Sequence, residues 1–425
     1  DTIYIVIFWI SDIPTSESTK YNIPTYEILL NRARMKDWLK VTLILCAFGT
    51  LREIRPSEPF VSEFLLGEWR NITEEQLNRE VYPVGTYSYL SLLVVVFLIT
   101  DFLRFKPVII LSGLSGITVY AILLWTTSLE WLQASQFFFG LYSATEVAYF
   151  TYIYAKVDST KYPIVSSYTR IAALTGRFLS GVSSQLLTHF EVMDYRQLNY
   201  ITFTGIYFES VCVSNMLEAS SLIVRHARAA YSRPKVLAWS ALYAAALALF
   251  VQCQTYMQLL WRLIQDDTEQ PVVYNGAVEA AQTLLGAAGA YTASTFSRSA
   301  TPAPAAAVQG VAMFLATHMN NVYVSYAGYI VMGMLFHYTI TLARLVSVAV
   351  WIDESCFGLI FGINTLLGTG LQSILTYILI QNLNLSLFSQ YYTISGLFMV
   401  VASLWILGWT VHMCKQKQTV NINNQ

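Results

Sequence analysis

The chain has 425 residues, of which 55% are hydrophobic and only 12% are charged, and its mean hydropathy is +0.48. A soluble domain carries roughly 25% charged residues, so this composition indicates a protein with many membrane spans. The net charge of −1 gives no indication of nucleic-acid binding, which would need a basic surface. The cysteines are scattered, and no phosphate-binding loop, hydrolase motif or metal-ligand spacing is present. The sequence therefore predicts neither an enzyme nor a bound cofactor or metal ion.

The first long apolar stretch, 38–66, is interrupted by charge and proline. Residues 1–36 before it are predicted to be a cytosolic tail, because their apolar run is shorter than the roughly 20 residues that a span needs. The interruption reads LREIRPSEPF at 51–60 and includes Arg55 and Glu58. Proline removes a helical hydrogen bond, and irregular backbone at membrane depth is tolerated where it is buried in protein or lines a wet cavity. Glu58 is therefore predicted to lie beside a path through the membrane.

Further apolar runs predict eleven more spans, which makes twelve. They cover about 83–103, 107–127, 131–155, 164–187, 199–217, 237–261, a run from 274, 303–318, 323–350, 355–381 and 388–412. The sixth is the weakest, because Glu209 interrupts it. This plan divides the chain into a six-helix half at 37–217, a cytosolic loop at 218–236, a second six-helix half at 237–413 and a tail at 414–425. The predicted fold is an all-α membrane protein of the major facilitator superfamily type.

Lysine and arginine in the loops predict the orientation. With both termini in the cytosol, only four face outside, namely Arg70, Arg79, Arg196 and Arg262. The inner side then receives Arg32, Arg34, Lys36, Lys40, Arg104, Lys106, Lys156, Lys161, Arg225, Arg228, Arg233, Lys235, Arg298, Lys415 and Lys417. Asn71, in an Asn-Ile-Thr triplet, then lies outside and is predicted to be glycosylated; the alternative is a chance occurrence of this common triplet.

Glu146 is the strongest candidate for a functional side chain, because it lies inside the apolar run GLYSATEVAYFTYIYA at 140–155. A charge at the bilayer centre costs on the order of 3 kcal/mol, so such residues usually face a bundle interior or a wet path. Its helical neighbours include Tyr142 and Tyr149, and an acid among rings suits an organic cation. The alternatives are structural: Glu146 neutralises Arg170 or Arg177 of the fifth span, or bonds to a nearby hydroxyl.

Later spans supply further polar candidates. Gln254, Thr255 and Gln258 of the seventh span are predicted either to bind a ligand or to join helices. The eighth span begins with Glu279 near its outer end, and the tenth carries His337 and Arg344.

Several segments together resemble the folate and thiamine carriers of animals. They are RPSEPF (55–60), YPVGTYSYL (82–90), TDFLRFKPVIIL (100–111), ATEVAYFTYIY (144–154), YNGAVEA (274–280), YAGY (326–329) and FGINT (361–365), in family order. The resemblance covers about 37–413. It implies a major facilitator fold and transport of a vitamin across the plasma membrane, with no cofactor.

The motif around Glu146 resembles the thiamine branch, since the folate branch has arginine in place of this glutamate. The resemblance implies that Glu58, Tyr82, Glu146 and Tyr149 line the thiamine site and that Glu279 is a structural or coupling acid. Two positions depart from the pattern. Gly85 stands where vertebrate thiamine carriers place tryptophan, and Thr255 stands where an asparagine is expected.

Three functions remain open from the sequence. The first is a carrier of thiamine or a related cation, either a uniporter or coupled to protons. The second is a carrier of folates or another anionic nutrient that uses Arg170, Arg177 and Arg344. The third is a non-transporting membrane receptor or scaffold on the same fold. Arg55 joins these arginines and Glu279 as a candidate coupling or structural charge.

Overall fold

The computed structural model describes residues 37–70, 72–103, 105–146, 162–214, 234–268, 273–295, 301–351 and 357–423. Residues Val41–Gln425 form one compact unit, and Asp1–Lys40 form another, of which residues 37–40 are described. Every regular element in the described residues is helical. The predicted fold class is therefore confirmed at the level of secondary structure.

The helices follow the predicted apolar runs closely. In the first part of the chain they are α3 (Asp37–Glu53), η1 (Glu58–Phe60), α4 (Val61–Leu65), α5 (Glu74–Gln76), η2 (Leu77–Val81), α6 (Tyr82–Leu103), α7 (Phe105–Trp125), α8 (Leu129–Ala144), α10 (Tyr162–His189) and α11 (Tyr195–Ser214). The second part contains α13 (Pro234–Thr268), α14 (Asn275–Thr295), α15 (Pro302–His318), α16 (Val322–Trp351), α17 (Phe357–Thr376), η6 (Tyr377–Asn382) and α18 (Leu387–Asn423). The weak sixth run is thus a helix, α11.

The first span is interrupted where the prolines predict it. Helix α3 ends at Glu53 and helical structure resumes at Glu58. Other helices satisfy the backbone groups that the break releases. The N–H of Arg55 donates to Ser180 Oγ (3.2 Å), and that of Ser57 donates to Thr202 Oγ1 (3.3 Å). Buried backbone polar groups need such partners, so the interruption is stabilised by specific hydrogen bonds within the core.

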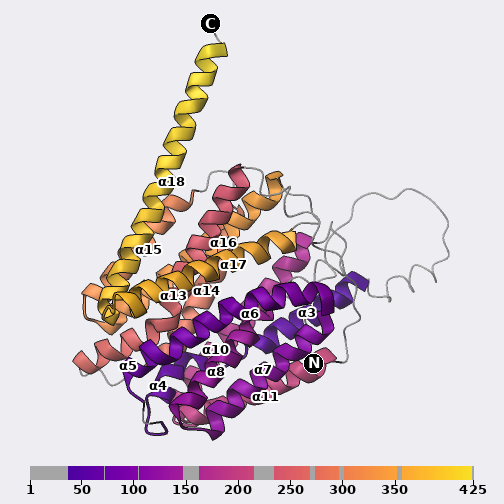
Figure 1. The fold of residues 1–425 in the computed structure, drawn as a ribbon, viewed down its shortest axis with the longest axis vertical. Coiled ribbons are helices and arrows are strands. Elements are labelled where there is room, and N and C mark those ends of the chain that lie inside the picture. Colours follow the sequence, from indigo (N-terminus) through magenta and orange to yellow (C-terminus); the bar gives the residue numbers. More distant parts are fainter. Residues whose placement is uncertain are drawn as a thin grey trace, which may run out of the picture. The chain divides into compact units, whose positions relative to one another are not determined.

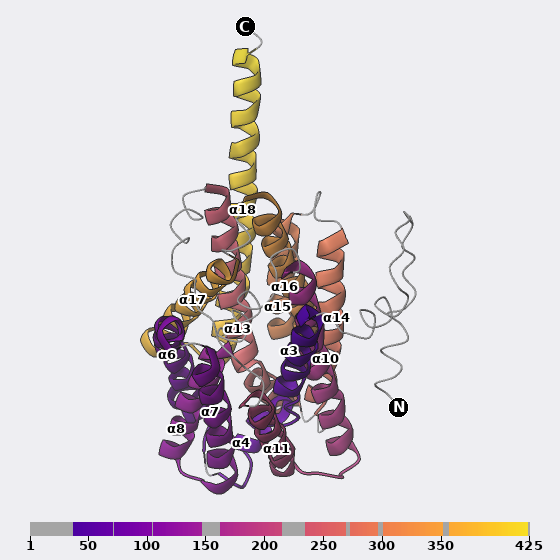
Figure 2. The same cartoon turned by 90° about the vertical axis from the view of Figure 1, so that its right-hand side faces the viewer.

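The two groups of helices, α3–α11 and α13–α18, meet mainly where α10 packs against α14 and α6 against α17, and η1 also contacts α14. In Figure 1 the first group, indigo to magenta, occupies mainly the lower part of the Val41–Gln425 unit. Figure 2 shows α10 and α14 side by side. Between these helices a Cβ on Gly181 would lie 2.7 Å from the carbonyl oxygen of Gly276, and one on Gly276 would lie 2.8 Å from that of Gly181. The two backbones therefore touch directly here.

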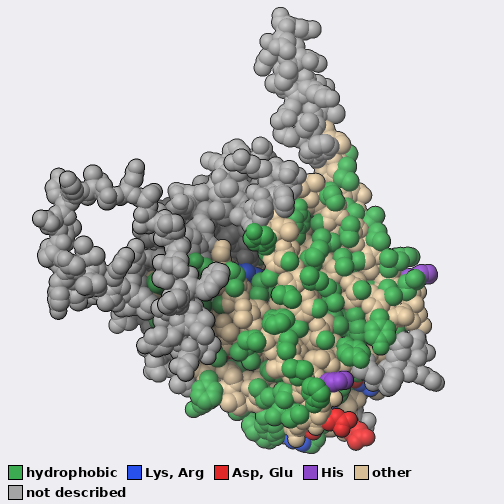
Figure 3. Space-filling view, turned by 180° about the vertical axis from the view of Figure 1, so that it is seen from behind, with side chains coloured by type: hydrophobic (Ala, Val, Ile, Leu, Met, Phe, Trp, Pro, Cys, Tyr) green, Lys and Arg blue, Asp and Glu red, His purple; other side chains and the backbone are tan. Residues whose placement is uncertain are grey.

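The outside of the bundle is apolar. Large hydrophobic side chains such as Leu114 (57% exposed), Phe208 (57%) and Leu404 (62%) point away from the core. Figure 3 shows hydrophobic side chains over the middle of one face, with acidic groups gathered at its lower end. Among the described residues four segments are long and apolar enough to cross a membrane: Leu237–Asp266, Val322–Ala343, Gly362–Asn382 and Leu387–Gly408. An apolar surface of this kind suits the lipid interior.

Candidate functional site

A cavity of about 340 Å³ lies between the two groups of helices. Its lining includes most of the residues that the sequence singled out: Arg55, Glu58, Tyr82, Tyr142, Glu146, Arg177, Gln254, Thr255, Gln258 and Glu279. Glu58 and Glu146, which were predicted to lie beside one path, both border this cavity.

The other predicted residues are placed differently. Asn71, Tyr149 and the side chain of Arg344 lie outside the described residues. Arg170 is not part of the cavity lining and contacts Nδ1 of His337 at 3.2 Å. His337 does not line the cavity either, although it lies on the tenth span; it is buried against the rings of Phe250 and Phe336.

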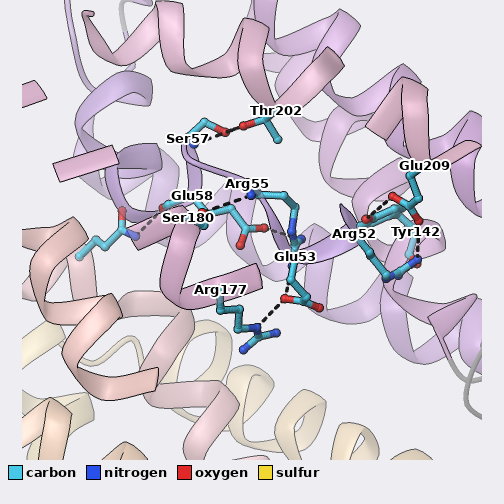
Figure 4. A network of polar contacts seen from close by, with 11 residues as sticks. Arg52, Glu53, Arg55, Ser57, Glu58, Tyr142, Arg177, Ser180, Thr202 and Glu209 are labelled. Carbon is cyan, nitrogen blue, oxygen red and sulfur yellow. Dashed lines mark hydrogen bonds and ion pairs between the residues drawn. The ribbon is translucent and has the colours of Figure 1, made fainter. Parts of the chain in front are cut away.

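A chain of alternating charges runs along the cavity wall (Figure 4). Arg177 Nε donates to Glu53 at 2.5 Å, and Arg55 donates to the same Glu53 oxygen at 3.2 Å and contacts Glu58 at 2.5 Å. Two guanidinium groups and two carboxylates therefore neutralise one another. Glu53 was not among the residues singled out from the sequence, although it flanks the same interruption as Glu58.

Arg52 forms a second cluster. It is buried, lies 3.6 Å from Glu209, and donates to Ser112 Oγ (2.8 Å) and to the carbonyl oxygen of Tyr142 (2.9 Å). Its guanidinium lies 4.1 Å from the centre of the Tyr142 ring. One face of that ring is thus already used by a cation of the protein. Glu209, the acid that weakened the apolar pattern of the sixth run, is the partner that this buried arginine needs.

Glu146 follows the end of α8 and is half-buried. It makes no hydrogen bond or ion pair with another described residue, although Arg52 is close enough to interact with it electrostatically. Arg177 pairs with Glu53 instead, and Arg170 contacts His337. The described geometry therefore gives no support to Glu146 as the structural partner of either arginine.

The second group of helices supplies a mainly neutral wall. Tyr329 donates to Glu279 at 2.8 Å and also hydrogen-bonds with Gln254. Thr255 Oγ1 donates to the carbonyl of Val251 in its own helix (2.8 Å). Glu279 is thus supported by a hydroxyl and has no cation bonded to it among the described residues.

Gln258 uses both ends of its amide to hold the interrupted first span. Its Nε2 donates to the carbonyl oxygen of Glu58 at 2.8 Å, and its Oε1 accepts from the N–H of Ser62 at 3.1 Å. The hydroxyl of Ser62 in turn lies 2.8 Å from that of Tyr82, whose ring meets Tyr256 edge to face. Gln258 therefore joins the two groups of helices beside the cavity.

A second junction between the two groups of helices lies around Arg262, at one end of the bundle. Arg262 of α13 donates to Glu63 at 3.0 Å and lies 3.3 Å from Glu74 and 4.0 Å from Asp266. Gln381 of η6 donates to the carbonyl of Arg79 at 3.0 Å. These bonds connect the two groups of helices, so we expect them to hold this end of the cavity closed.

Replacing Arg262 with glutamine should open this end more often. Three carboxylates would then face one another without a cation, and each partly exposed ion pair lost is worth roughly 0.2–1 kcal/mol. A total near 1 kcal/mol, from about two such pairs, changes a two-state population about fivefold. The measurement is the rate at which an impermeant thiol reagent labels Thr255→Cys from outside, compared with the same cysteine beside intact Arg262. An unchanged rate would contradict a role of Arg262 in closing the bundle.

The same labelling should slow when the outer medium is acidified. Burial raises the pKa of Glu74 above its ordinary value, although Arg262 acts in the opposite direction. A carboxyl group whose pKa is raised in the closed form binds its proton more tightly there, so acid favours the closed form. Arg262→Gln should enlarge this dependence on pH, because it removes the only cation bonded to Glu74 among the described residues.

Two solved transporter structures have a similar arrangement of helices. The nucleoside transporter NupG matches with a TM-score of 0.59 and 11% identity over 86% of this chain and 98% of its own. A bacterial homolog of the human lysosomal transporter Spinster, inward-facing and unoccupied, matches with a TM-score of 0.59 and 12% identity over 88% and 96%. The fold is that of the major facilitator transporters.

Sequence comparison gives the family. The chain belongs to the reduced folate carrier family, which matches residues 36–221 and 209–393. Its relatives include human thiamine transporter 1 (29% identical, over 95% of this chain and 97% of the relative) and folate-like transporter 3 of Caenorhabditis elegans (31%, over 91% and 100%). The human reduced folate transporter is 29% identical over 88% of this chain and 72% of its own. The chain is thus a multi-pass membrane transporter and not an enzyme.

Proposed function

We propose that this protein carries thiamine, or a closely related organic cation, across the plasma membrane by alternating access. The observation that carries the proposal is the charge of the cavity wall. Three arginines line it, Arg52, Arg55 and Arg177, against four glutamates, Glu53, Glu58, Glu146 and Glu279. Arg52 is already paired with Glu209, which lies outside this lining, so carboxylates are in excess along the wall and suit a positively charged substrate.

The distribution of the ion pairs supports the same substrate. Each of the three arginines already contacts a glutamate. A folate would have to displace one of these carboxylates to reach a guanidinium, whereas a cation finds Glu146 without a bonded partner among the described residues. Several relatives are named thiamine transporters, which agrees with this reading.

Uptake measurements test the proposal directly. Cells that express the chain should accumulate labelled thiamine in a saturable way and should accumulate labelled folate no faster than control cells. Saturable folate uptake without thiamine uptake would favour the anion carrier. Normal surface expression with uptake of neither would favour a receptor or scaffold on this fold.

We also propose that both termini lie in the cytosol and that protons are the coupling ion, because the cavity carboxylates can carry them. Glycosylation of Asn71 tests the proposed orientation, because that orientation places Asn71 outside the cell. Treating the protein from animal cells with a glycosidase should increase its gel mobility, and Asn71→Gln should remove that shift. Absence of the shift in the unaltered protein would count against the orientation.

A further inference from the structure

Arg170 and His337 form a contact between the two groups of helices, away from the cavity. Arg170 comes from α10 and His337 from α16, and neither lines the cavity. Nη2 of Arg170 lies 3.2 Å from Nδ1 of His337. A guanidinium can only donate a hydrogen bond, so Nδ1 accepts here and carries no proton. The imidazole of His337 is therefore neutral in this structure.

The imidazole ring is enclosed by its own group of helices. His337 is 4% exposed, and the rings of Phe250 and Phe336 lie beside it. A Cβ on Gly286 of α14 would lie only 2.4 Å from His337 Cδ2, so the ring fills the space that this glycine leaves. A ring enclosed in this way has little freedom to follow Arg170 when the two groups of helices move apart.

Arg170 lies well away from the point where the backbones of the two groups touch. That point is the contact of Gly181, on the same helix, with Gly276 of α14. Eleven residues of helix separate Gly181 from Arg170, which corresponds to about 16 Å. At this distance a change of roughly 10° in the angle between the groups moves Arg170 by about 3 Å, which is enough to break a hydrogen bond. The groups can therefore part at His337 while the two glycines stay in contact.

The two ends of α10 contact the second group of helices differently. Near its end, Gln185 bonds the start of α14: its Nε2 donates to the carbonyl oxygen of Val273 (3.2 Å), and its Oε1 accepts from the N–H of Ala277 (3.1 Å). This start of α14 follows the end of α13 that carries Arg262. Arg170 lies in the other direction along α10, which is toward the cytosol in the orientation that we propose.

Uptake of a proton by His337 would break the hydrogen bond. Nδ1 would then carry an N–H directed at the N–H groups of Arg170, so that two donors would meet. Both side chains would also be positively charged, and like charges at this separation repel. Histidine is the side chain whose charge ordinarily changes between about pH 5 and 8. The contact can therefore respond to the pH of the cytosol.

The charged groups on the surrounding helices are engaged elsewhere or lie near helix ends. Their bonds leave the contact of Arg170 with His337 intact, so a change in the charge of the histidine acts on the arginine at close range. These groups are Glu53 of α3 paired with Arg177 of α10, Glu279 of α14 bonded to Tyr329, Arg344 of α16, whose side chain lies outside the described residues, and, near the ends of α13 and α15, Lys235, Arg262, Asp266, Asp267 and His318.

We propose that the hydrogen bond from Arg170 to His337 is a proton-sensitive latch between the two groups of helices. It holds the groups together on the cytosolic side while His337 is neutral, and it releases them when the cytosol becomes acidic. This inference rests on the alternating access of the proposed function but not on the identity of the substrate. Its test therefore follows the motion of the protein and contains no thiamine.

An impermeant thiol reagent, applied outside cells that express Thr255→Cys, measures this motion. The outer medium stays at about pH 7.5, and a permeant weak acid brings the cytosol from about pH 7.5 to about pH 6, within the ordinary titration range of histidine. Alternating access opens one side at a time, so release of the latch should slow labelling from outside. We expect roughly a fivefold decrease in rate, from the loss of a hydrogen bond to a charged group. Labelling of the chain without the added cysteine is subtracted as background.

Two substitutions separate the latch from its sensitivity to protons. In His337→Asn the side-chain oxygen takes the position of Nδ1 and accepts from Arg170 at either pH, so labelling should be fast at both. Arg170→Met removes the donor, so labelling should be slow at both. His318→Asn is the matched control, because His318 is exposed and contacts Tyr392 within the second group of helices. This control should respond to cytosolic pH as the unaltered protein does.

The rate is measured on protein at the cell surface, so lower expression changes the amount of labelled protein but not its rate of labelling. A response to cytosolic pH that is as large in His337→Asn as in the unaltered protein would overturn the latch. Equal rates at both pH values in the unaltered protein would overturn it too. Either result would leave the proposed transport of thiamine intact, since uptake is measured separately. A cysteine at position 255 that is labelled at neither pH would contradict alternating access itself, and the latch with it.

Discussion

Glu146→Gln is expected to lower thiamine affinity roughly ten- to a hundredfold, because a lost charge-assisted contact is worth about 1.5–3 kcal/mol. The substitution keeps the shape of the side chain and removes its charge. The protein should still reach the cell surface in normal amount, since no described residue depends on Glu146 for an ion pair. The measurements are the half-saturation concentration of thiamine uptake and the surface level, taken on the same cells.

Glu130→Gln is the matched control, because Glu130 lies in the first turn of the same helix and is exposed. It should leave both quantities unchanged. Glu146→Arg should abolish thiamine uptake, since it places a cation where the substrate's charge is expected to lie. Normal affinity in a normally expressed Glu146→Gln protein would contradict the cation site.

Glu53→Gln, unlike Glu146→Gln, should strongly reduce the amount of protein at the cell surface. Glu53 is 5% exposed and bonds both Arg177 and Arg55. Breaking a buried ion pair costs about 3–5 kcal/mol, and we expect the lower end of this range because the Arg177 side chain is 40% exposed. A loss of this size is a large fraction of the stability of a typical fold. Surface labelling and the melting temperature of the detergent-solubilised protein measure it.

A double variant that removes both Glu53 and its cationic partner Arg177 provides the control for this experiment. In Glu53→Gln/Arg177→Gln the remaining Arg55 and Glu58 still neutralise each other at 2.5 Å. The double variant should therefore regain much of the lost surface level, although each single substitution in it removes a bond. A double variant that is expressed no better than Glu53→Gln would mean that packing, and not the unpaired charge, causes the defect.

The positions of the helices were largely predictable because each span must be a long apolar run and each break carries proline or charge. The interruption at 51–60 was predictable for this reason, and so was the presence of Glu58 and Glu146 beside one cavity. Acidic side chains in apolar runs have few places to lie. The resemblance to a known family added the prediction that the chain is similar to the thiamine branch and that its substrate is a vitamin.

The partners within the cavity were not predictable, because each joins distant parts of the chain. Arg52 and Glu209 are separated by 157 positions, and neither lies in a recognisable motif. Arg177 was an obvious candidate to neutralise Glu146, yet it pairs with Glu53.

The direct contact of Gly181 with Gly276 has a mechanical consequence for transport. Two backbones in direct contact cannot move closer together, so we expect this point of α10 and α14 to act as a pivot. When the groups of helices separate on one side of such a point, they must approach on the other. With glycine at these two positions, we expect the opening of one mouth of the cavity to accompany the closing of the other.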